Sequence, residues 1–215
     1  MRDEMKLDGS ATQPDGGGIA SPGRFRSLCV FAGSRIGCDP AHRDAAQALG
    51  ILLAKRRIRL IYGGGAIGLM GITAKATLNN GGEVTGIIPD FLMSLEVGDP
   101  GVTELIVVDS MHARKALMFE KADGFVVLPG GLGTIDETIE IATWKQLQLH
   151  KKPIVVVNIS GYWGGLVSLL SEVVEGGYAH HGISGLLTFV ESVDEIFPAL
   201  ASASPPSREV LTSHL

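Results

Sequence analysis

Short apolar runs alternate along this chain with segments whose apolar residues recur at helical spacing. The runs are continuous rather than alternating, and several are rich in Val and Ile. Such runs are typical of strands that are buried on both faces of a parallel sheet. We therefore expect strands at 27–32, 58–62, 84–88, 105–108, 125–128, 153–157 and 187–190.

Helices are expected between these strands, because apolar residues there recur every three or four positions, as at Ala45, Leu49 and Leu52. The pattern places them at 40–55, up to Asn80, at 111–121, from the glycine-rich turn near 130–134 to about Leu149, at 163–175 and at 193–200. Regular alternation of strand and helix predicts an α/β fold, a doubly wound parallel sheet in a single domain.

Composition sets the expected boundaries of that domain. Residues 1–26 are rich in Gly, Pro, Ser and Asp, so a mobile tail is expected there. The domain should span 27–200, and the Ala/Ser/Pro-rich segment 201–215 should form a loose tail.

Overall composition excludes several classes of protein. With 45% hydrophobic and 19% charged residues, the chain reads as soluble and globular, not disordered. A net charge of −5 argues against a nucleic-acid partner, and the absence of a run of about 18 apolar residues argues against a membrane span. The two cysteines, Cys29 and Cys38, suit a reducing cytoplasm.

The most informative stretch is a glycine-rich turn between the strand at 125–128 and the helix that follows it. It contains Pro129, Gly130, Gly131, Gly133 and Thr134. Glycines let backbone N–H groups approach a ligand, and a helix start favours an anion. A phosphate is therefore the expected ligand, with the Thr134 hydroxyl as a further donor.

Two carboxylates, Asp136 and Glu137, are expected in the first turn of that helix. They would repel a bound phosphate, so a pure phosphate cradle does not explain them. Either they stabilise the helix start, or one of them acts on a group attached to the phosphate.

Four polar or glycine-rich segments follow predicted strands: Gly33-Ser34, Gly63–Gly65, Met111–Lys115 and 129–137. In open parallel sheets, ligands bind at the carboxyl ends of the strands, near the point where strand order reverses. The four segments are therefore expected to meet in one crevice. We expect the strand at 105–108 to neighbour that at 125–128, which would let Arg114 meet Glu137.

The second glycine turn, at 63–71, leaves alternatives open. It could be a dinucleotide fingerprint, but Asp90 is poorly placed to bind a ribose, and no Gly-Lys-Ser/Thr follows to make a P-loop. It could also be only a tight turn. Arg114 and Lys115 at a helix start indicate a nearby anion or simply face solvent, and His112 could either titrate or pack. No residues have the spacing of a metal site.

Two motifs in order now resemble a known family. The segment 129–137 matches PGGxGTxxE, and Met111-His112-Ala113-Arg114-Lys115 lies at the expected distance upstream. Both resemble the LONELY GUY family of cytokinin riboside 5′-monophosphate phosphoribohydrolases, often labelled lysine decarboxylases. The resemblance covers roughly residues 27–200, and one departure is Asp136, where a glutamate is common.

The resemblance implies a Rossmann-like fold, a homodimer, and release of an adenine-type base from a nucleoside 5′-monophosphate. It implies that Arg114 and Glu137 are the catalytic pair. No cofactor or metal is expected. The residues expected to bind substrate are Gly33, Ser34, Gly64, Gly65, Met111, Lys115, Pro129, Gly130, Gly131, Gly133, Thr134 and Asp136.

Two other functions remain compatible with the same crevice. A nucleotide-binding or carrier protein would hold the ligand without turnover, but it has no need of a carboxylate such as Glu137. A nicotinamide-dependent reductase would bind NAD(P) tightly. The segment 141–149 is apolar on more than one face, so it is either a dimer contact or a helix buried in its own subunit.

Overall fold

The computed structural model describes residues 25–93 and 98–203 of the chain. Most of the two predicted tails and part of the predicted loop at 90–103 lie outside the described residues. The last helix runs to Ser202, two residues past the expected end of the domain.

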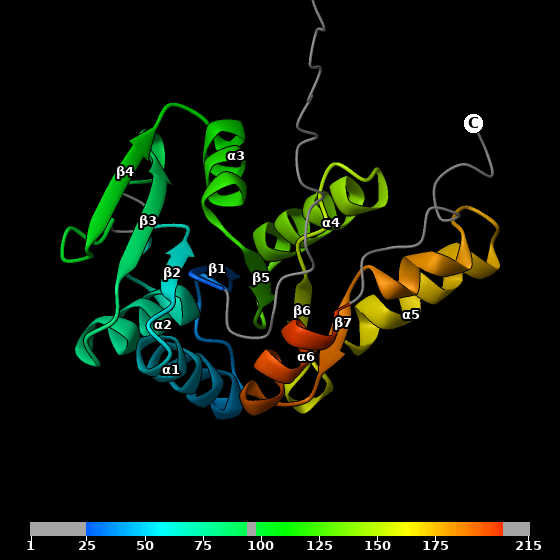
Figure 1. Ribbon diagram of the computed structural model, residues 1–215, viewed down its shortest axis with the longest axis horizontal. Helices are drawn as coiled ribbons and strands as arrows, with labels where there is room; N and C mark the ends of the chain where they lie inside the picture. The colour runs from blue at the N-terminus through cyan, green and yellow to red at the C-terminus, as the bar shows by residue number, and fades with distance from the viewer. Residues whose placement is uncertain (1–24, 94–97, 204–215) are drawn as a thin grey trace, which may run out of the picture.

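A single seven-stranded parallel sheet forms the centre of the fold (Figure 1). Each strand starts and ends within one residue of its predicted position, which confirms the α/β prediction. The strands are β1 (Ser27–Phe31), β2 (Arg59–Tyr62), β3 (Val84–Pro89), β4 (Glu104–Val108), β5 (Gly124–Val127), β6 (Ile154–Val157) and β7 (Thr188–Val190).

Among the described residues, five α-helices lie between strands and a sixth follows β7. They are α1 (Pro40–Lys55), α2 (Gly68–Asn79), α3 (Met111–Lys121), α4 (Leu132–Gln146), α5 (Gly164–Glu175) and α6 (Ile196–Ser202). Short 3₁₀ turns lie at η1 (Asp90–Leu92), η2 (Ile159–Gly161), η3 (His181–Gly185) and η4 (Val193–Glu195). Helix α4 ends before the predicted Leu149, because Gln148 adopts a left-handed backbone conformation (φ 57°).

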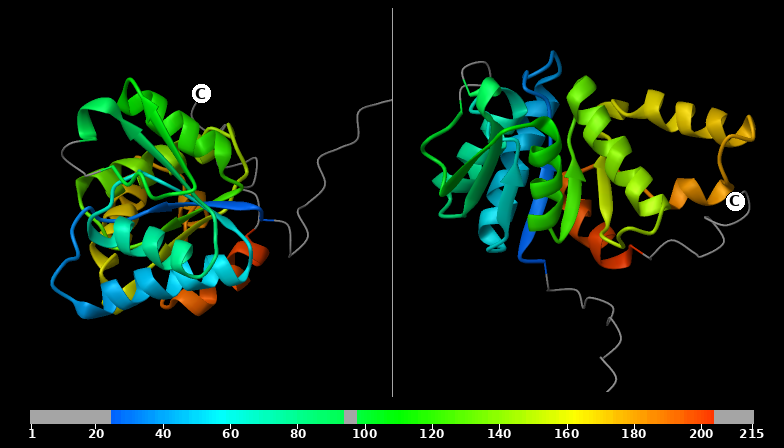
Figure 2. Two further views of the ribbon diagram at one scale, coloured as in Figure 1. Left: turned by 90° about the vertical axis from the view of Figure 1, so that its left-hand side faces the viewer. Right: turned by 90° about the horizontal axis from the view of Figure 1, so that it is seen from above.

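Helices cover both faces of the sheet (Figures 1 and 2). Side chains alternate along each strand, so Leu28 and Val30 of β1 pack with α1, α2 and α6. Cys29 and Phe31 point to the opposite face, where they join the cluster formed with α3, α4 and α5. Burial on both faces explains why the strands read as continuous apolar runs.

The strand order is β4-β3-β2-β1-β5-β6-β7, so the order reverses between β1 and β5. Our expectation that β4 neighbours β5 is wrong, because β3, β2 and β1 lie between them. Helix α3 instead crosses back from the edge strand and contacts β3, β2 and β1 on its way to β5. This crossing brings the start of α3 above the carboxyl ends of the central strands.

Candidate active site

The turn between β5 and α4 is packed against the end of β1. The Gly33 N–H donates to the Pro129 carbonyl at 3.1 Å. A Cβ atom on Gly130 would overlap the Thr134 hydroxyl and lie 2.9 Å from the Gly33 nitrogen. The two loops therefore meet as predicted, and Gly130 is required by this close packing.

Gly131 and Gly133 are glycines for a different reason. Both are exposed, and a Cβ atom added to either would meet no heavy atom of the described chain within 4 Å. Gly131 also has an ordinary φ of −90°, so its backbone does not require glycine. Neither packing nor strain explains these two residues, whose open backbone leaves room for a ligand.

The start of α4 is uncapped in the described structure. Gly131 is the N-cap residue, no side chain caps the helix, and its first turn holds no acidic residue. The prediction that Asp136 and Glu137 lie in the first turn is wrong, because Leu132, Gly133 and Thr134 are already helical. The first turn therefore presents free N–H groups and carries no carboxylate of its own, an arrangement that favours an anion.

Glu137 lies on the inward face of α4. Thr134, Glu137, Thr138 and Ile141 are buried at helical spacing, and the Thr138 hydroxyl donates to the Thr134 carbonyl at 2.6 Å. Glu137 is only 9% exposed, whereas the Asp136 side chain is 59% exposed. Helix geometry thus turns one carboxylate towards the crevice and the other towards solvent.

Arg114 approaches the crevice from the first turn of α3. Ser110 caps this helix by accepting from the Ala113 N–H at 3.2 Å. The Arg114 side chain is almost fully buried, and its Nη2 donates to the Gly63 carbonyl at 3.0 Å. A buried cation is costly unless it is hydrogen-bonded and paired, so this position demands acceptors.

Gly63 makes room for that arginine. A Cβ atom at this position would overlap the guanidinium group and lie 2.9 Å from its Cζ atom and 3.3 Å from Met70 Sδ. Our candidate residues included Gly64 and Gly65 but not Gly63. The signal was available, since Gly63 follows β2 directly, as Ala32 and Gly33 follow β1.

Gly64 and Gly65 shape the rest of this turn. Gly64 has a left-handed backbone (φ 80°), its carbonyl accepts from Asp99 at 3.1 Å, and Gly65 forms a bridge with Gly98. The tight-turn interpretation therefore accounts for Gly64.

The charges of Arg114 and Glu137 act on the same buried thiol. Burial raises the pKa of Cys29 on β1 well above its usual value. The negative charge of Glu137 adds to this rise, and the positive charge of Arg114 opposes it. The helices that carry the two charges, α3 and α4, both pack in the hydrophobic cluster on this face of the sheet.

Lys115 lies beside this pair and binds carboxylates of α4. Its Nζ lies 3.1 Å from Asp136 and 3.0 Å from Glu140. Burial lowers the pKa of Lys115, but the hydrogen bonds to Glu140 and Asp136 outweigh it, so the pKa is raised overall. These contacts join the start of α3 to α4, and Glu140 was not among our candidate residues.

The remaining candidates lie on α3 and on the loop that follows β1. Met111 packs its sulfur 3.8 Å from Arg114 Nη1. The Gly33 carbonyl accepts from Leu69 at 2.9 Å, which fixes the loop that carries the exposed Ser34. His112 is exposed. Within the described residues, no group of three His, Cys, Asp or Glu side chains could hold a metal ion.

Comparison with known proteins gives the same family as the motifs. A family described as "Possible lysine decarboxylase" matches residues 70–200. A cytokinin riboside 5′-monophosphate phosphoribohydrolase of Arabidopsis thaliana, LOG1, is 40% identical over 187 residues, which cover 87% of this chain and 88% of that protein. A probable enzyme of the same name from Oryza sativa, LOGL9, is 43% identical over 81% of this chain and 77% of its own length.

The chain belongs to the LONELY GUY (LOG) family. The resemblance drawn from the two motifs is thereby confirmed. Solved structures with lower identity share the fold of this LOG-family chain. The molybdenum cofactor carrier protein of Chlamydomonas reinhardtii has a TM-score of 0.62 at 20% identity over 82% of this chain and 96% of its own. A molybdenum cofactor binding protein of Rippkaea orientalis has a TM-score of 0.59 at 21% identity over 81% and 94%.

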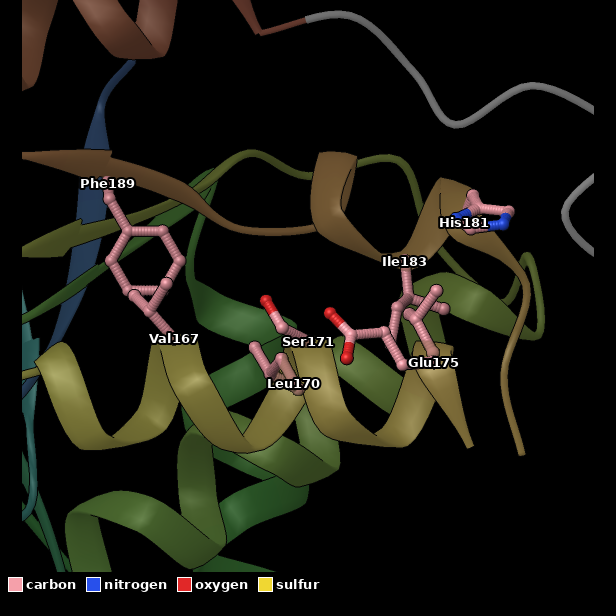
Figure 3. A pocket seen from close by; sticks show the side chains of 8 residues that line it. Val167, Leu170, Ser171, Glu175, His181, Ile183 and Phe189 are labelled. Atoms are coloured by element: carbon pink, nitrogen blue, oxygen red, sulfur yellow. The ribbon is translucent and has the colours of Figure 1, made fainter. Parts of the chain in front are cut away.

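A groove of about 370 Å³ lies elsewhere on this LOG-family protein, between α5, η3 and β7 (Figure 3). Its lining is mostly apolar, with Ser171, Glu175 and His181 as polar members. None of our candidate residues is among those that line it, so the groove is separate from the crevice.

One contact to the glycine turn was missed at the level of sequence. The Tyr162 hydroxyl, just before α5, donates to the Gly130 carbonyl at 2.6 Å. Nothing in the local pattern distinguishes this tyrosine from an ordinary loop aromatic. Its partner is 32 residues away and is reached only because β5 and β6 are neighbours.

In the described part of the chain, no helix is long and apolar enough to span a membrane.

Proposed function

We propose that this chain hydrolyses the N-glycosidic bond of adenine-type, N6-modified (cytokinin) nucleoside 5′-monophosphates, releasing free base and ribose 5-phosphate. LOG-family relatives about 40% identical to it are named for this activity. The observation that carries the proposal is the buried Glu137, one turn beyond an open, uncapped glycine turn and on a helix that packs on the same face of the sheet as the helix of the buried Arg114.

The chemistry calls for such a carboxylate. When the bond from C1′ to the base nitrogen breaks, its electron pair leaves with the base, and positive charge develops on the ribose. Glu137 is proposed to stabilise that charge or to accept a proton from the water that attacks C1′. Arg114 would orient Glu137 and the substrate and assist the departing base. Water is the only co-substrate, so we propose no cofactor.

The glycine turn supplies the phosphate site in this proposal. Gly130, Gly131, Gly133 and Thr134 would bind the 5′-phosphate through the start of α4. The substrate would also contact the other residues of the crevice, namely Gly33, Ser34, Gly64, Gly65, Met111, Lys115, Pro129 and Asp136. A carrier without turnover is the alternative, and the buried Glu137 argues against it, since a binder has no use for an anion beside a phosphate.

Nucleosides that lack the phosphate should be poor substrates. We expect base release from AMP and from isopentenyladenosine monophosphate. We expect little release from adenosine, because adenosine has no phosphate for the uncapped helix start to bind. Chromatography of the free base after incubation measures all three. Equal turnover of adenosine and AMP would rule out the phosphate site. The rates of base release from AMP and from isopentenyladenosine monophosphate, compared with each other, identify the preferred base.

Glu137→Gln keeps the shape of the side chain and removes its charge. Turnover of AMP should fall by about two or more orders of magnitude, the scale of general-base and electrostatic contributions. AMP binding should survive, because the phosphate site is made largely of backbone. Glu172→Gln, the same change at an exposed glutamate of α5 outside the proposed site, is the matched control. If Glu137→Gln keeps near-parent turnover, the proposed role of Glu137 is wrong.

We further propose a homodimer formed through the outer face of α4 and the turn that follows it. Leu132, Leu147 and Leu149 are exposed by 86%, 60% and 68%, although Ile141 and Ala142 of the same helix are buried within the subunit. Light scattering at micromolar concentration should give the dimer mass, and Leu147→Asp should lower it. Leu169→Asp on α5, also exposed, is the control. A monomeric parent protein would contradict this assembly.

The setting we propose is cytoplasmic. Cys29 and Cys38 are both unpaired thiols, as a reducing compartment favours. The net charge of −5 disfavours a nucleic acid or an anionic membrane surface as a partner.

A further inference from the structure

Tyr162 reaches from one connection of the sheet into another. It follows β6, whereas its hydrogen-bond partner Gly130 follows β5. At 2.6 Å the bond from the hydroxyl to the Gly130 carbonyl is short for a neutral pair. Gly130 packs closely against Thr134 and Gly33, and this packing fixes the position of its Cα atom. Gly131 and Gly133 have no such contact.

The tyrosine ring is held in place although the residue is 45% exposed. It makes edge-to-face contacts with His42 of α1, at 5.1 Å between ring centroids, and with Trp163, at 5.0 Å. His42 and Trp163 are both buried. Two fixed aromatic neighbours therefore aim the hydroxyl at the glycine turn.

The bonded carbonyl determines where the next N–H points. The Gly130 carbonyl and the Gly131 N–H belong to one peptide group, and the described chain has no cis peptide bond. In a trans peptide these two groups point in opposite directions. With the carbonyl held by Tyr162, the Gly131 N–H is directed away from Tyr162, on the side of the peptide opposite that contact.

This peptide needs an external restraint. It lies between two glycines, which lose the most conformational freedom on folding and resist rotation least. Gly131 has no side chain to pack, and even an added Cβ atom would meet no heavy atom within 4 Å. If the peptide rotated, a carbonyl oxygen would replace an N–H beside the start of α4. That oxygen would repel the anion that the helix start attracts.

We propose that Tyr162 is a positioning residue that orients the Gly130–Gly131 peptide towards the 5′-phosphate, and so sets the affinity of the site for phosphate-bearing ligands. The inference rests on the proposed function for the identity of that ligand. Tyr162 should affect the binding of the ligand and not the bond-breaking step, because its hydroxyl donates to the backbone of the glycine turn and not to Glu137 or Arg114.

Tyr162→Phe keeps the ring contacts and removes only the hydroxyl. In the full chain carrying Glu137→Gln, so that AMP is not consumed, calorimetric titration should show AMP binding weakened roughly 3- to 10-fold, the range that one neutral hydrogen bond supplies. Adenosine binding should be unchanged. With Glu137 present, KM for AMP should rise by the same factor and kcat should stay within about twofold. Tyr178→Phe, at an 89% exposed tyrosine, is the control.

Each result decides between the proposals. Unchanged AMP affinity in Tyr162→Phe overturns the positioning role, and so does an equal loss for AMP and adenosine, which would indicate a general structural effect. If the parent protein binds AMP but releases no base, hydrolysis is wrong while the binding comparison still tests Tyr162. If the parent protein does not bind AMP, both proposals fall.

Discussion

The site depends on one constraint, the contact between the buried Arg114 guanidinium group and the backbone of Gly63. Arg114 enters from α3 and donates to the Gly63 carbonyl at 3.0 Å, in space that a Cβ atom on Gly63 would fill. The crossing of α3 over the central strands makes this meeting possible. Burial of a cation is costly unless acceptors surround it, and the Gly63 carbonyl supplies one of them.

Glycines in the two turns perform different tasks. Gly63 and Gly130 are required by close contact with Arg114 and with Thr134 and Gly33. Gly131 and Gly133 are surrounded by open space at the start of α4. The first pair fixes the positions of groups within the protein, and the second leaves backbone N–H groups accessible. The proposed phosphate site uses the accessible N–H groups of this second pair.

Much of this could be predicted from sequence, and the exceptions have physical causes. Strand positions were predictable because burial on both faces leaves a continuous apolar run, and the glycines at 130–133 indicated the turn between β5 and α4. The position of β4 at the sheet edge was not predictable, since strand order depends on long-range pairing that leaves no local trace. The contact of Gly63 with Arg114 and that of Tyr162 with Gly130 were not predicted, because the partners lie 51 and 32 residues away.

Hydrolysis of AMP by Gly63→Ala tests the account most directly. The new Cβ atom must displace Arg114, so base release should fall by about 100-fold or more. Gly165→Ala on α5, where a Cβ atom meets nothing within 4 Å, should keep the parent rate. If the effect is steric, adding Gly63→Ala to Arg114→Ala should cost little further stability. A folded Gly63→Ala protein with near-parent turnover would contradict the claim that this contact organises the active site.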